Sequence, residues 1–452
     1  MEHFDLVIVG SGSGNSIPGP EMDDWKIAMV EAGTFGGTCL NVGCIPSKML
    51  VLPADLVAAV RASSRLGINV ELDSVDWPAI RDRVFGRIDA VVADGERYRE
   101  DLPNSTVIRG EASFVAEKVL AVDGREITAD RIVLAAGSRP IVPPMPGIDS
   151  VDYHTSDTIM RVDEVPPRLI ILGAGYISAE LGHVFEAFGA EVTIITRGPT
   201  MLTAEDREVR ERYTELAHRR FHLHCTAVVD RIEQSGDDII VEGRSERGPF
   251  RAVGDALLAA IGRVPNSDRL DVERGGLTTH PDGRVVVDDT LATAVPGVWA
   301  FGDLTNPYQL KHVANAEAKI VAYNLVHPEM PRHMDWSIVP HAVFGSPQVA
   351  SVGLTEEAAI GADIPVTCGS YPYSGTAYGW ALEDTEGFVK LVAHAQTRRL
   401  LGAHIIGPHA SSLIQQLIQG MRFGRTVDEM AAEQMYIHPA MSEVVENALL
   451  EL

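Results

Sequence analysis

Residues 168–196 decide the fold, and they read RLIILGAGYISAELGHVFEAFGAEVTIIT. Arg168 to Leu172 is an apolar, strand-like run that ends in the glycine turn Gly173 to Gly175. The apolar residues after this turn share one face of a helix: Ile177, Leu181, Val184, Phe185 and Phe188. Gly189 stops that helix, and Val192 to Thr196 forms a second strand. The stretch predicts a βαβ unit of the kind that binds a dinucleotide at its glycine loop.

A second copy of this pattern stands at the N-terminus. Phe4 to Val9 and Lys26 to Val30 read as strands on either side of a glycine turn. The candidate cofactor-binding residues here are Gly10, Gly12, Gly14 and Glu31, whose carboxylate can bind ribose hydroxyls. Asn15 stands where the motif expects a glycine, and Pro18 and Pro20 interrupt the expected helix. We expect a short or bent helix, and taken alone the motif also fits a plain glycine-rich turn.

The end of the returning strand indicates which nucleotide the second unit binds. Thr196 and Arg197 stand where an NAD site typically carries an acidic residue. An arginine accommodates the 2′-phosphate of NADP, so we expect NADPH rather than NADH. The alternative for Arg197 is a solvated cation at a strand end.

The stretch GGTCLNVGCIP at residues 36–46 carries the chemistry. In a regular helix, positions five apart point about 140° away from each other, so joining the sulfurs of Cys39 and Cys44 requires a distorted turn. Gly43 supplies the conformational freedom. Pro46 fits the start of a helix, whose N-terminus lowers the pKa of a thiol. We therefore expect a redox-active pair.

Two other uses of the pair stay open. A structural disulfide that closes so short a loop adds little stability and can be reduced in the cytosol. Two thiolates without Cys or His neighbours make only half of a metal site, and we expect no metal. Cys225 and Cys368 lack comparable surroundings, and we expect both to be inert buried thiols.

Length and charge limit the architecture and the partners. A chain of 452 residues exceeds one ordinary core and predicts two or three domains. A formal net charge of −25 argues against nucleic acid or an anionic membrane as partner, because both require a basic surface. We see no signal peptide and no apolar run that approaches the roughly 20 residues of a membrane span, so we expect a cytoplasmic protein.

The pattern changes from about Asp335. Phe388 to Ala393 and Leu400 to Ile406 read as strands, and an apolar helix comes after them through Leu413, Leu417, Ile418 and Met421. Earlier in the chain, residues 47–65 and 75–100 read as helices and Arg131 to Ala136 as a buried strand. The predicted fold class is α/β, with two Rossmann-like dinucleotide-binding domains and a C-terminal α+β domain.

Seven motifs succeed one another along the chain. They are Gly10 to Gly14, the segment from Gly36 to Lys48, AAGSRP at 135–140, the Gly173 loop, GRVPN at 262–266, FGD at 301–303, and His438 and Pro439 with Glu443. In this order they closely resemble the pyridine nucleotide-disulfide reductases, over essentially the whole chain. The resemblance implies FAD and NAD(P)H as cofactors, a small-molecule disulfide as substrate, and a homodimer whose active site is shared between subunits.

The resemblance also implies catalytic roles. Cys44 would lie against the flavin, and Cys39 would attack the substrate disulfide. A histidine held by a carboxylate can protonate a departing thiolate near neutral pH. His438 of the partner subunit, oriented by Glu443, would do so here.

Further implied residues contact the cofactors. Lys48 would stand near the flavin and pair with Glu180. Asp303 would contact FAD, and Tyr176 would cover the nicotinamide pocket. The other cofactor contacts are Thr38, Gly137, Ile177, Gly262 and Arg263. The implied domains are FAD-binding over residues 1–150 and 266–334, NAD(P)H-binding over 151–265, and dimerisation over 335–452.

Within the family the likeness is strongest to the mycothione reductases. GTFGGTC at 33–39, the proline-broken segment after the first glycine loop, YHTSD at 153–157 and AYGW at 377–380 carry it. The likeness implies reduction of mycothione by NADPH. Thr203 stands where a second phosphate-binding arginine is expected, so use of NADH stays open. The alternatives are a dihydrolipoamide dehydrogenase and a flavin-bearing binding or scaffold protein without the reaction.

Overall fold

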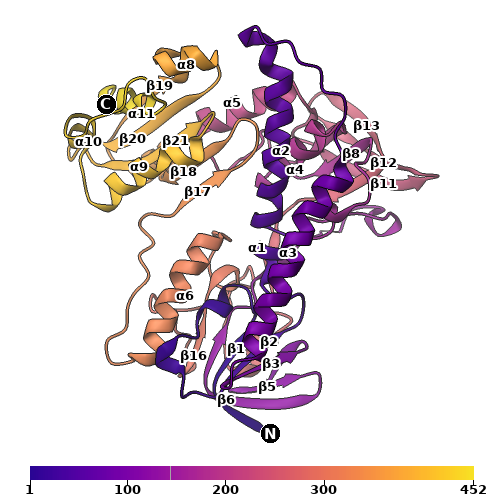
Figure 1. Cartoon of the computed structure of the whole chain (residues 1–452), viewed down its shortest axis with the longest axis vertical. Coiled ribbons are helices and arrows are strands. Elements are labelled where there is room, and N and C mark those ends of the chain that lie inside the picture. Colours follow the sequence, from indigo (N-terminus) through magenta and orange to yellow (C-terminus); the bar gives the residue numbers. More distant parts are fainter. Residues whose placement is uncertain (143) are drawn as a thin grey trace. The chain divides into compact units, whose positions relative to one another are not determined.

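The computed structural model describes residues 1–142 and 144–452 (Figure 1). They form two compact units, each assembled from separate stretches of the chain. The first unit consists of Met1–Ser47, Ala79–Ile141 and Gly262–Asp335. The second consists of Lys48–Pro78, Val142–Ile261 and Trp336–Leu452.

The first unit is built on a seven-stranded sheet in the order β3-β2-β1-β6-β5-β4, with β16 also paired to β6. Its strands are β1 (Glu2–Val9), β2 (Ile27–Glu31), β3 (Ser105–Arg109), β4 (Ala112–Ala116), β5 (Val119–Val122), β6 (Arg125–Leu134) and β16 (Val298–Ala300), with a separate pair β7 (Ser138–Pro140) and β15 (Arg263–Pro265). Its helices include α1 (Gly37–Asn41) and α6 (Lys311–Val326), while α2 (Cys44–Ala62) and α3 (Trp77–Glu100) continue into the second unit.

Two neighbouring strands of this sheet are buried on both faces. Leu6 to Val9 and Ile27 to Val30 are buried without alternation, which is typical of parallel strands that are covered on both sides. The strand order turns back between β1 and β6, and open α/β sheets bind ligands outside the carboxyl ends of strands at such a switch point. The first glycine loop comes directly after β1 and therefore lies at this point.

The second unit holds three sheets, in the orders β10-β9-β8-β14, β11-β12-β13 and β17-β18-β21-β20-β19. The strands are β8 (Arg168–Leu172), β9 (Glu191–Ile195), β10 (His222–His224), β11 (Val228–Ser235), β12 (Asp238–Ser245), β13 (Gly248–Gly254), β14 (Ala256–Ala259), β17 (Pro340–Val343), β18 (Val349–Gly353), β19 (Val366–Pro372), β20 (Phe388–His394) and β21 (Leu400–Ile406). The helices are α4 (Tyr176–Ala187), α5 (Arg207–His218), α7 (Glu356–Gly361), α8 (Ala377–Leu382), α9 (Ala410–Arg422), α10 (Val427–Ala432) and α11 (Glu443–Leu450). The five-stranded sheet is antiparallel, and α9 and α11 pack against it (Figure 1).

These elements confirm the predicted fold class. The predicted strands at 168–172 and 400–406 are β8 and β21 without change of bounds, and α4 begins directly after the second glycine loop. The predicted α+β part is the five-stranded sheet with its helices. The division into four functional segments stays a prediction.

The first glycine loop does not lead into an α-helix. A four-residue 3-10 turn, Ser13–Ser16, precedes a second short 3-10 turn, Pro20–Met22. Pro18 and Pro20 explain the absence, because a proline lacks the N–H that an α-helix interior requires. The expected short or bent helix is thus reduced to 3-10 turns.

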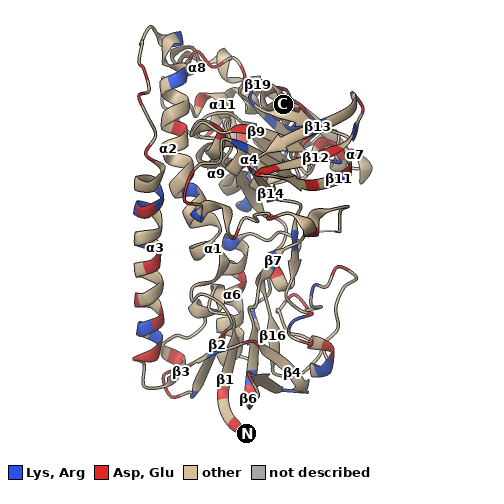
Figure 2. Ribbon diagram, turned by 90° about the vertical axis from the view of Figure 1, so that its right-hand side faces the viewer, with Lys and Arg blue, Asp and Glu red and all other residues tan. Residues whose placement is uncertain are grey.

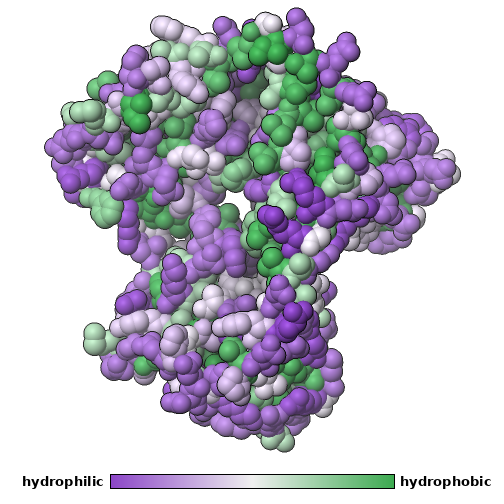
Figure 3. Space-filling view, viewed as in Figure 1, coloured by the Kyte–Doolittle hydropathy of each residue, from purple (hydrophilic) through white to green (hydrophobic). Residues whose placement is uncertain are grey.

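We expected no apolar run close to the length of a membrane span. Judged by length and composition alone, one stretch contradicts this expectation. Gly37–Leu66 is long and apolar enough, with a third of its most apolar window buried. Leu52 and Leu56 on α2 are exposed, and Figure 3 shows apolar surface over this helix. One such helix is weak evidence, since core helices of soluble proteins pass the same test. Lys48 on α2 also pairs with Glu180 of α4, an interaction within the protein.

Acidic and basic residues are interspersed along the ribbon of α3 (Figure 2). Arg97 of this helix pairs with Asp94, and Glu96 pairs with Arg109 of β3. α3 therefore carries no uninterrupted row of basic residues of the kind that follows a phosphate backbone.

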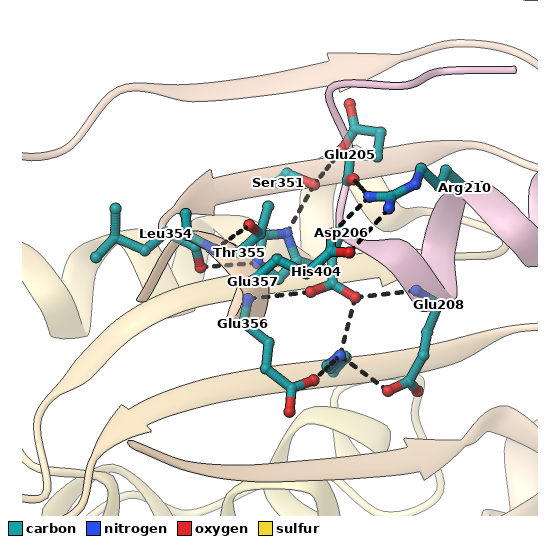
Figure 4. A network of polar contacts seen from close by, with 12 residues as sticks. Glu205, Asp206, Glu208, Arg210, Ser351, Leu354, Thr355, Glu356, Glu357 and His404 are labelled. Atoms are coloured by element: carbon teal, nitrogen blue, oxygen red, sulfur yellow. Dashed lines mark hydrogen bonds and ion pairs between the residues drawn. The ribbon is translucent and has the colours of Figure 1, made fainter. Parts of the chain in front are cut away.

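A buried polar network joins α5 to the five-stranded sheet inside the second unit. The ammonium of Lys390, almost fully buried, meets Asp206 at 2.9 Å, Glu208 at 2.8 Å and Glu356 at 2.6 Å. Figure 4 shows the three carboxylates converging. Although burial opposes ionisation, these contacts raise the pKa of Lys390. A charge buried at 1% exposure needs such partners, so the network specifies how α5 docks on the sheet.

Candidate active site

The turn between Cys39 and Cys44, called the redox turn below, joins the five-residue helix α1 to the nineteen-residue helix α2. Cys39 lies in α1 and Cys44 opens α2, and both are free thiols in this structure. The two side chains share a hydrogen bond. Between them, Gly43 passes so close to α1 that a Cβ there would stand 2.9 Å from the carbonyl oxygen of Thr38. A glycine is therefore required at position 43 because a side chain would collide with the backbone of α1. We predicted the glycine for its conformational freedom, and the structure gives this steric reason in its place.

A buried amide holds the start of this turn. Asn41 donates from Nδ2 to the carbonyl oxygens of Phe35 at 2.9 Å and Gly37 at 3.0 Å. Gly36 and Gly37 have φ of 94° and 69°, in the left-handed region that favours glycine. The amide thus fixes the two glycines that lead into Cys39.

The surroundings of Cys39 oppose its ionisation. The pKa of Cys39 is raised, first by the hydrogen bond that it donates to Cys44, then by burial and by the charge of Cys44. Lys311 and the backbone N–H of Cys44 act in the opposite direction. The hydrogen bond and burial therefore favour the protonated form of the Cys39 thiol.

The first glycine loop is a tight junction of three chain segments. The N–H of Gly10 donates to the carbonyl oxygen of Val30, and the N–H of Ala135 donates to that of Val9, each at 2.8 Å. Gly10 has a φ of 104°, and a Cβ on it would stand 2.3 Å from the carbonyl oxygen of Ala135. No other residue fits at this position.

Glu31 is bonded to the loop itself. Its carboxylate accepts from the N–H of Ser11 at 2.8 Å and from the Ser11 hydroxyl at 2.6 Å. Its second oxygen accepts from the N–H of Gly33 at 2.8 Å. The serine hydroxyl in turn accepts from the N–H of Gly36 at 2.8 Å. One serine thus connects the loop, the acidic residue and the redox turn.

The residues predicted around Asp303 also come together. Its carboxylate accepts from the Ser138 hydroxyl at 2.6 Å, and that hydroxyl accepts from Nε of Arg263 at 2.8 Å. Gly137, just before Ser138, has a φ of 65°, and Gly262, just before Arg263, has a φ of 132°. Both glycines allow turns that bring β7 and β15 together as an antiparallel pair.

A fully buried carboxyl, that of Glu317, binds the backbone next to Asp303. Glu317 of α6 accepts from the N–H of Gly302 at 2.8 Å and from the Asn306 amide at 3.0 and 3.1 Å. Burial raises the pKa of Glu317 to about 7, against the effect of these hydrogen bonds and with a contribution from Asp303. The carboxyl is therefore partly protonated near neutral pH.

The second glycine loop repeats the construction of the first. Gly173 has a φ of 104°, its N–H donates to the carbonyl oxygen of Ile195 at 2.8 Å, and a Cβ on it would stand 2.2 Å from the oxygen of Ala260. A Cβ on Gly175 would meet nothing within 4 Å, so the space at the N-terminus of α4 is open. The Ser178 hydroxyl there is buried and has no hydrogen-bond partner among the described residues.

The side chains predicted around this loop are mostly accessible. Tyr176 and Arg197 are exposed, Ile177 is half-buried, and Thr203 is exposed where a second arginine was expected. Arg197 comes after β9, and no acidic residue stands beside it in sequence at the strand end. The predicted nucleotide residues are thus available to a ligand.

Lys48 and Glu180 form a close pair in the second unit. Lys48 Nζ lies 2.5 Å from Glu180 Oε2 and 4.8 Å from the centre of the Phe344 ring. Glu180 is buried in α4, and its other carboxylate oxygen accepts from the N–H of Phe344 at 3.0 Å. The lysine is therefore held at one position by a charge and a ring.

His438 and Glu443 form the other pair in this unit. Nδ1 of His438 lies 2.7 Å from Oε1 of Glu443, whose second oxygen accepts from the N–H of Ala440 at 3.1 Å. The hydrogen bond with His438 lowers the pKa of Glu443. The carboxylate stays charged and fixes the ring, which leaves Nε2 on an exposed side chain to exchange a proton.

Two residues that contact the first glycine loop, Arg99 and Lys311, belong to none of the sequence motifs. Arg99, at 8% exposure, donates from Nε to Asn15 Oδ1 and from Nη2 to the Asn15 carbonyl oxygen, each at 2.6 Å. Lys311 donates to the Ser13 hydroxyl at 2.8 Å. The other thiols behave largely as expected: Cys225 is buried, whereas Cys368 is only half-buried and burial raises its pKa to about 11.

These features fit two dinucleotides. A glycine loop follows β1 in the seven-stranded sheet and β8 in the four-stranded sheet, and each of these strands pairs in parallel with both of its neighbours. At such a loop the backbone can approach a pyrophosphate. The second loop opens a helix of twelve residues whose free N–H groups suit an anion. Among the described residues, no group of three or more His, Cys, Asp or Glu side chains could hold a metal ion.

Comparisons with known proteins agree with this geometry. Residues 4–318 match the family model for pyridine nucleotide-disulphide oxidoreductases, and residues 339–449 match the dimerisation domain of that family. The chain is 46% identical over 462 residues to a mycothione reductase of Mycobacterium tuberculosis, with 100% of both chains covered. It is 32% identical to a dihydrolipoyl dehydrogenase of Chlamydia pneumoniae, with 99% and 97% covered.

A solved structure shows the same fold. The HOCl-induced flavoprotein disulfide reductase RclA from Escherichia coli matches with a TM-score of 0.86 at 29% identity, over 99% of each chain. The matched proteins include disulfide reductases that bear a flavin, and the matched family uses FAD and a nicotinamide nucleotide.

Proposed function

Because the chain belongs to the pyridine nucleotide-disulphide oxidoreductase family, we propose that it is an NADPH-dependent flavoprotein that reduces mycothione to mycothiol. The observation that carries the redox role is the pair of thiols at Cys39 and Cys44, hydrogen-bonded to each other beside a glycine loop. The 46% identity to a mycothione reductase over the full length supports the substrate.

Each glycine loop holds one cofactor in this proposal. FAD binds at Gly10, Gly12, Gly14, Glu31, Thr38, Gly137 and Asp303, in the segments 1–150 and 266–334, and at Gly262 and Arg263 at the end of the segment 151–265. NADPH binds at Gly173, Gly175, Tyr176, Ile177 and Arg197 within 151–265. When bound, FAD supplies the carrier that takes two electrons from the nicotinamide and delivers them to the cysteine pair. Lys48, one helical turn beyond Cys44 and held by Glu180, supplies a fixed positive charge.

The cysteines then carry out two exchanges. The Cys39 thiolate attacks one sulfur of mycothione, which breaks the substrate disulfide, forms a mixed disulfide and releases one mycothiol as a thiolate. His438 of the partner subunit, held by Glu443, gives that thiolate its proton. The Cys44 thiolate next attacks Cys39, which releases the second mycothiol and re-forms the Cys39–Cys44 disulfide. Two electrons from NADPH return the pair to thiols.

The protein works as a homodimer in this proposal, with residues 335–452 as the dimerisation part. Met435 and Ile437, the neighbours of His438, are 98% and 73% exposed in the single chain. Large apolar side chains at such exposure indicate a surface that a partner covers. The proposed location is the cytoplasm, where thiols are kept reduced and disulfides are usually transient and catalytic.

A substrate comparison tests the proposal. Purified enzyme is assayed with mycothione, glutathione disulfide and lipoamide, each with NADPH and with NADH. We expect mycothione with NADPH to give the highest kcat/KM. The Cys39→Ser variant should lose all disulfide turnover and keep its bound flavin. A preference for NADH with lipoamide would assign the chain to the dihydrolipoamide dehydrogenases, and no disulfide-dependent oxidation of either nucleotide would refute the enzyme.

A further inference from the structure

The segment 201–206, which leads into α5, is bonded to the second glycine loop. The N–H of Leu202 donates to the carbonyl oxygen of Ala174 at 2.8 Å. Ala174 stands between Gly173 and Gly175, at the point where the backbone can approach a pyrophosphate. The position of Leu202 therefore bears directly on the shape of this loop.

Leu202 has a backbone conformation that leucine disfavours. Its φ is 52°, in the left-handed region, and its side chain is buried. Such a conformation persists only where the surrounding contacts hold it, and it is found most often at ligand sites. Contacts on both sides hold it here, because the carbonyl oxygen of Leu202 also accepts from the N–H of Glu205 at 2.9 Å. The geometry of the loop thus depends on what fixes Glu205.

The side chain of Glu205 is fixed by the five-stranded sheet. Its Oε1 lies 2.6 Å from Nε2 of His341 on β17, and its Oε2 accepts from the Ser351 hydroxyl on β18 at 2.5 Å. His341 and Ser351 are paired residues of the two strands, so the carboxylate bridges both. Figure 4 shows Glu205 and Ser351 directed toward each other. Glu205 is 5% exposed, and a buried carboxylate needs such partners.

The neighbouring Asp206 has a different task. Its carboxylate accepts from the Lys390 ammonium at 2.9 Å and from the N–H of Glu208 at 3.1 Å, which holds the first turn of α5. The link to the loop instead runs through Glu205. Three hydrogen bonds in series connect the sheet to the loop: Ser351 to Glu205, Glu205 to Leu202, and Leu202 to Ala174.

We propose that Glu205 is a positioning residue for the nicotinamide nucleotide, which holds Leu202 against the second glycine loop and so fixes the backbone that receives the pyrophosphate. The inference rests on the proposed function, in which this loop binds NADPH. Glu205 takes part in no covalent step and transfers no proton. Its removal should weaken nucleotide binding and leave hydride transfer within the bound complex unchanged.

Anaerobic stopped-flow reduction of the bound flavin by NADPH tests this role without a disulfide substrate. The dependence of the rate on NADPH concentration gives a Kd for NADPH and a limiting rate. We compare the parent protein with Glu205→Ala, Glu205→Gln and Ser351→Ala, and we measure the flavin content of each. Glu191→Ala is the matched control, because Glu191 is exposed at the opposite end of β9.

We expect the Kd for NADPH to rise about three- to tenfold in Glu205→Ala, while the limiting rate stays within about twofold. Ser351→Ala removes one of the two contacts and leaves Glu205 in place, so its Kd should rise about two- to fourfold. This variant answers the question if Glu205→Ala fails to fold. Glu205→Gln keeps polar atoms at both positions and should stay within about twofold of the parent, as should Glu191→Ala.

An unchanged Kd in both Glu205→Ala and Ser351→Ala, at normal flavin content, would overturn the proposal. A limiting rate that falls as far as the Kd rises, or an equal rise in Glu191→Ala, would also overturn it, because the effect would then be general damage. A Kd in Glu205→Gln as high as in Glu205→Ala would exclude anchoring by hydrogen bonds. Failure of the proposed function is separate: it would appear as absent mycothione turnover in the parent, while NADPH still reduces the flavin and the comparison of Kd values stands.

Discussion

The two glycine loops of this chain share one construction, but they lead into different elements. In both, the first glycine has a φ of 104° and its N–H donates to a carbonyl oxygen at the carboxyl end of the neighbouring strand at 2.8 Å. In both, a Cβ on that glycine would stand 2.2 or 2.3 Å from the carbonyl oxygen of the residue that directly follows the strand on the other side. After Gly175 the chain enters a twelve-residue helix, and after Gly12 it enters a four-residue 3-10 turn.

The two loops show that the glycine turn forms whether or not an α-helix follows it. Three parallel strands and one glycine suffice to build the turn, whatever the chain does next. The helix N-terminus that usually supplies positive potential is present only at the second loop. At the first loop two side chains bring positive charge instead: Arg99 holds Asn15, and Lys311 holds Ser13. In the proposed function, backbone N–H groups would therefore meet the anion at the second loop, and these two cations would do so at the first.

The largest effects should come from filling the glycine positions. Gly10→Ala and Gly173→Ala each force a side chain against a carbonyl oxygen at a φ that costs about 1 to 3 kcal/mol for a residue other than glycine. We expect Gly10→Ala to purify without flavin. Gly173→Ala should stay yellow, while its flavin is reduced by NADPH at least a hundredfold more slowly.

Flavin absorbance per chain and the rate of bleaching by NADPH measure the two effects. Gly19→Ala is the control, because a Cβ at Gly19 meets nothing within 4 Å and its φ is −138°. The assignment of one nucleotide to each loop is wrong if both alanine variants lose the same function.

The next effect concerns the second loop alone. Arg197→Ala removes the exposed cation proposed to bind the 2′-phosphate, and we expect kcat/KM for NADPH to fall about 10- to 100-fold. The value for NADH should change less than about threefold. Steady-state kinetics with both nucleotides provides the measurement, with Arg207→Ala at the start of α5 as control. A parallel loss for NADH would count against phosphate recognition by Arg197.

A smaller effect, on the rate of FAD dissociation, is expected at the first loop. Arg99→Met leaves two oxygens of Asn15 without their donor, at a cost of about 1 to 3 kcal/mol. We therefore expect FAD to dissociate about tenfold faster, as measured by the recovery of flavin fluorescence on dilution. Arg97→Met, an exposed residue on the same helix, should leave the rate unchanged. Equal rates in both variants would remove Arg99 from the account of this loop.

The smallest effect concerns the pH dependence of stability, which we expect to have opposite signs for Glu317 and Glu205. Glu317 has a pKa of about 7 in the folded chain, so the folded state holds a proton that the unfolded state releases near pH 4.3. Its contribution to stability is present below that value and is lost as the pH rises through about 7. Burial opposes ionisation of Glu205, but its hydrogen bonds with His341 and Ser351 and the charges of His341 and His404 together lower its pKa. Its contribution to stability is therefore lost as the pH falls.

Glu317→Gln imitates the neutral form and isolates this effect. Its stability relative to the parent should grow between pH 5 and pH 8, by on the order of 1 kcal/mol. Urea unfolding at four pH values, monitored by flavin release, gives the comparison. Glu205→Gln should instead lose stability relative to the parent as the pH rises from 4 to 6. Parallel curves for Glu317→Gln and the parent would show that this carboxyl does not titrate as described.

Local patterns predicted most of the fold. Apolar periodicity and glycine turns placed β8, α4 and β21, and Pro18 with Pro20 signalled the weak helix at the first loop. The cysteine pair was identified by spacing, although the reason for Gly43 was misjudged, since close approach of backbone cannot be read from one residue type. Arg99 and Lys311 were missed because their contacts bridge 84 and 298 positions. At such separation a lysine or arginine looks like any other surface cation.

The most direct test of the central claim is an anaerobic reductive titration of the purified yellow protein. If Cys39 and Cys44 exchange electrons with a bound flavin, each chain takes up four electrons, two in the flavin and two in the pair. Cys39→Ser should then take up two. Uptake of only two electrons by the parent protein, with its disulfide intact afterwards, would contradict the account.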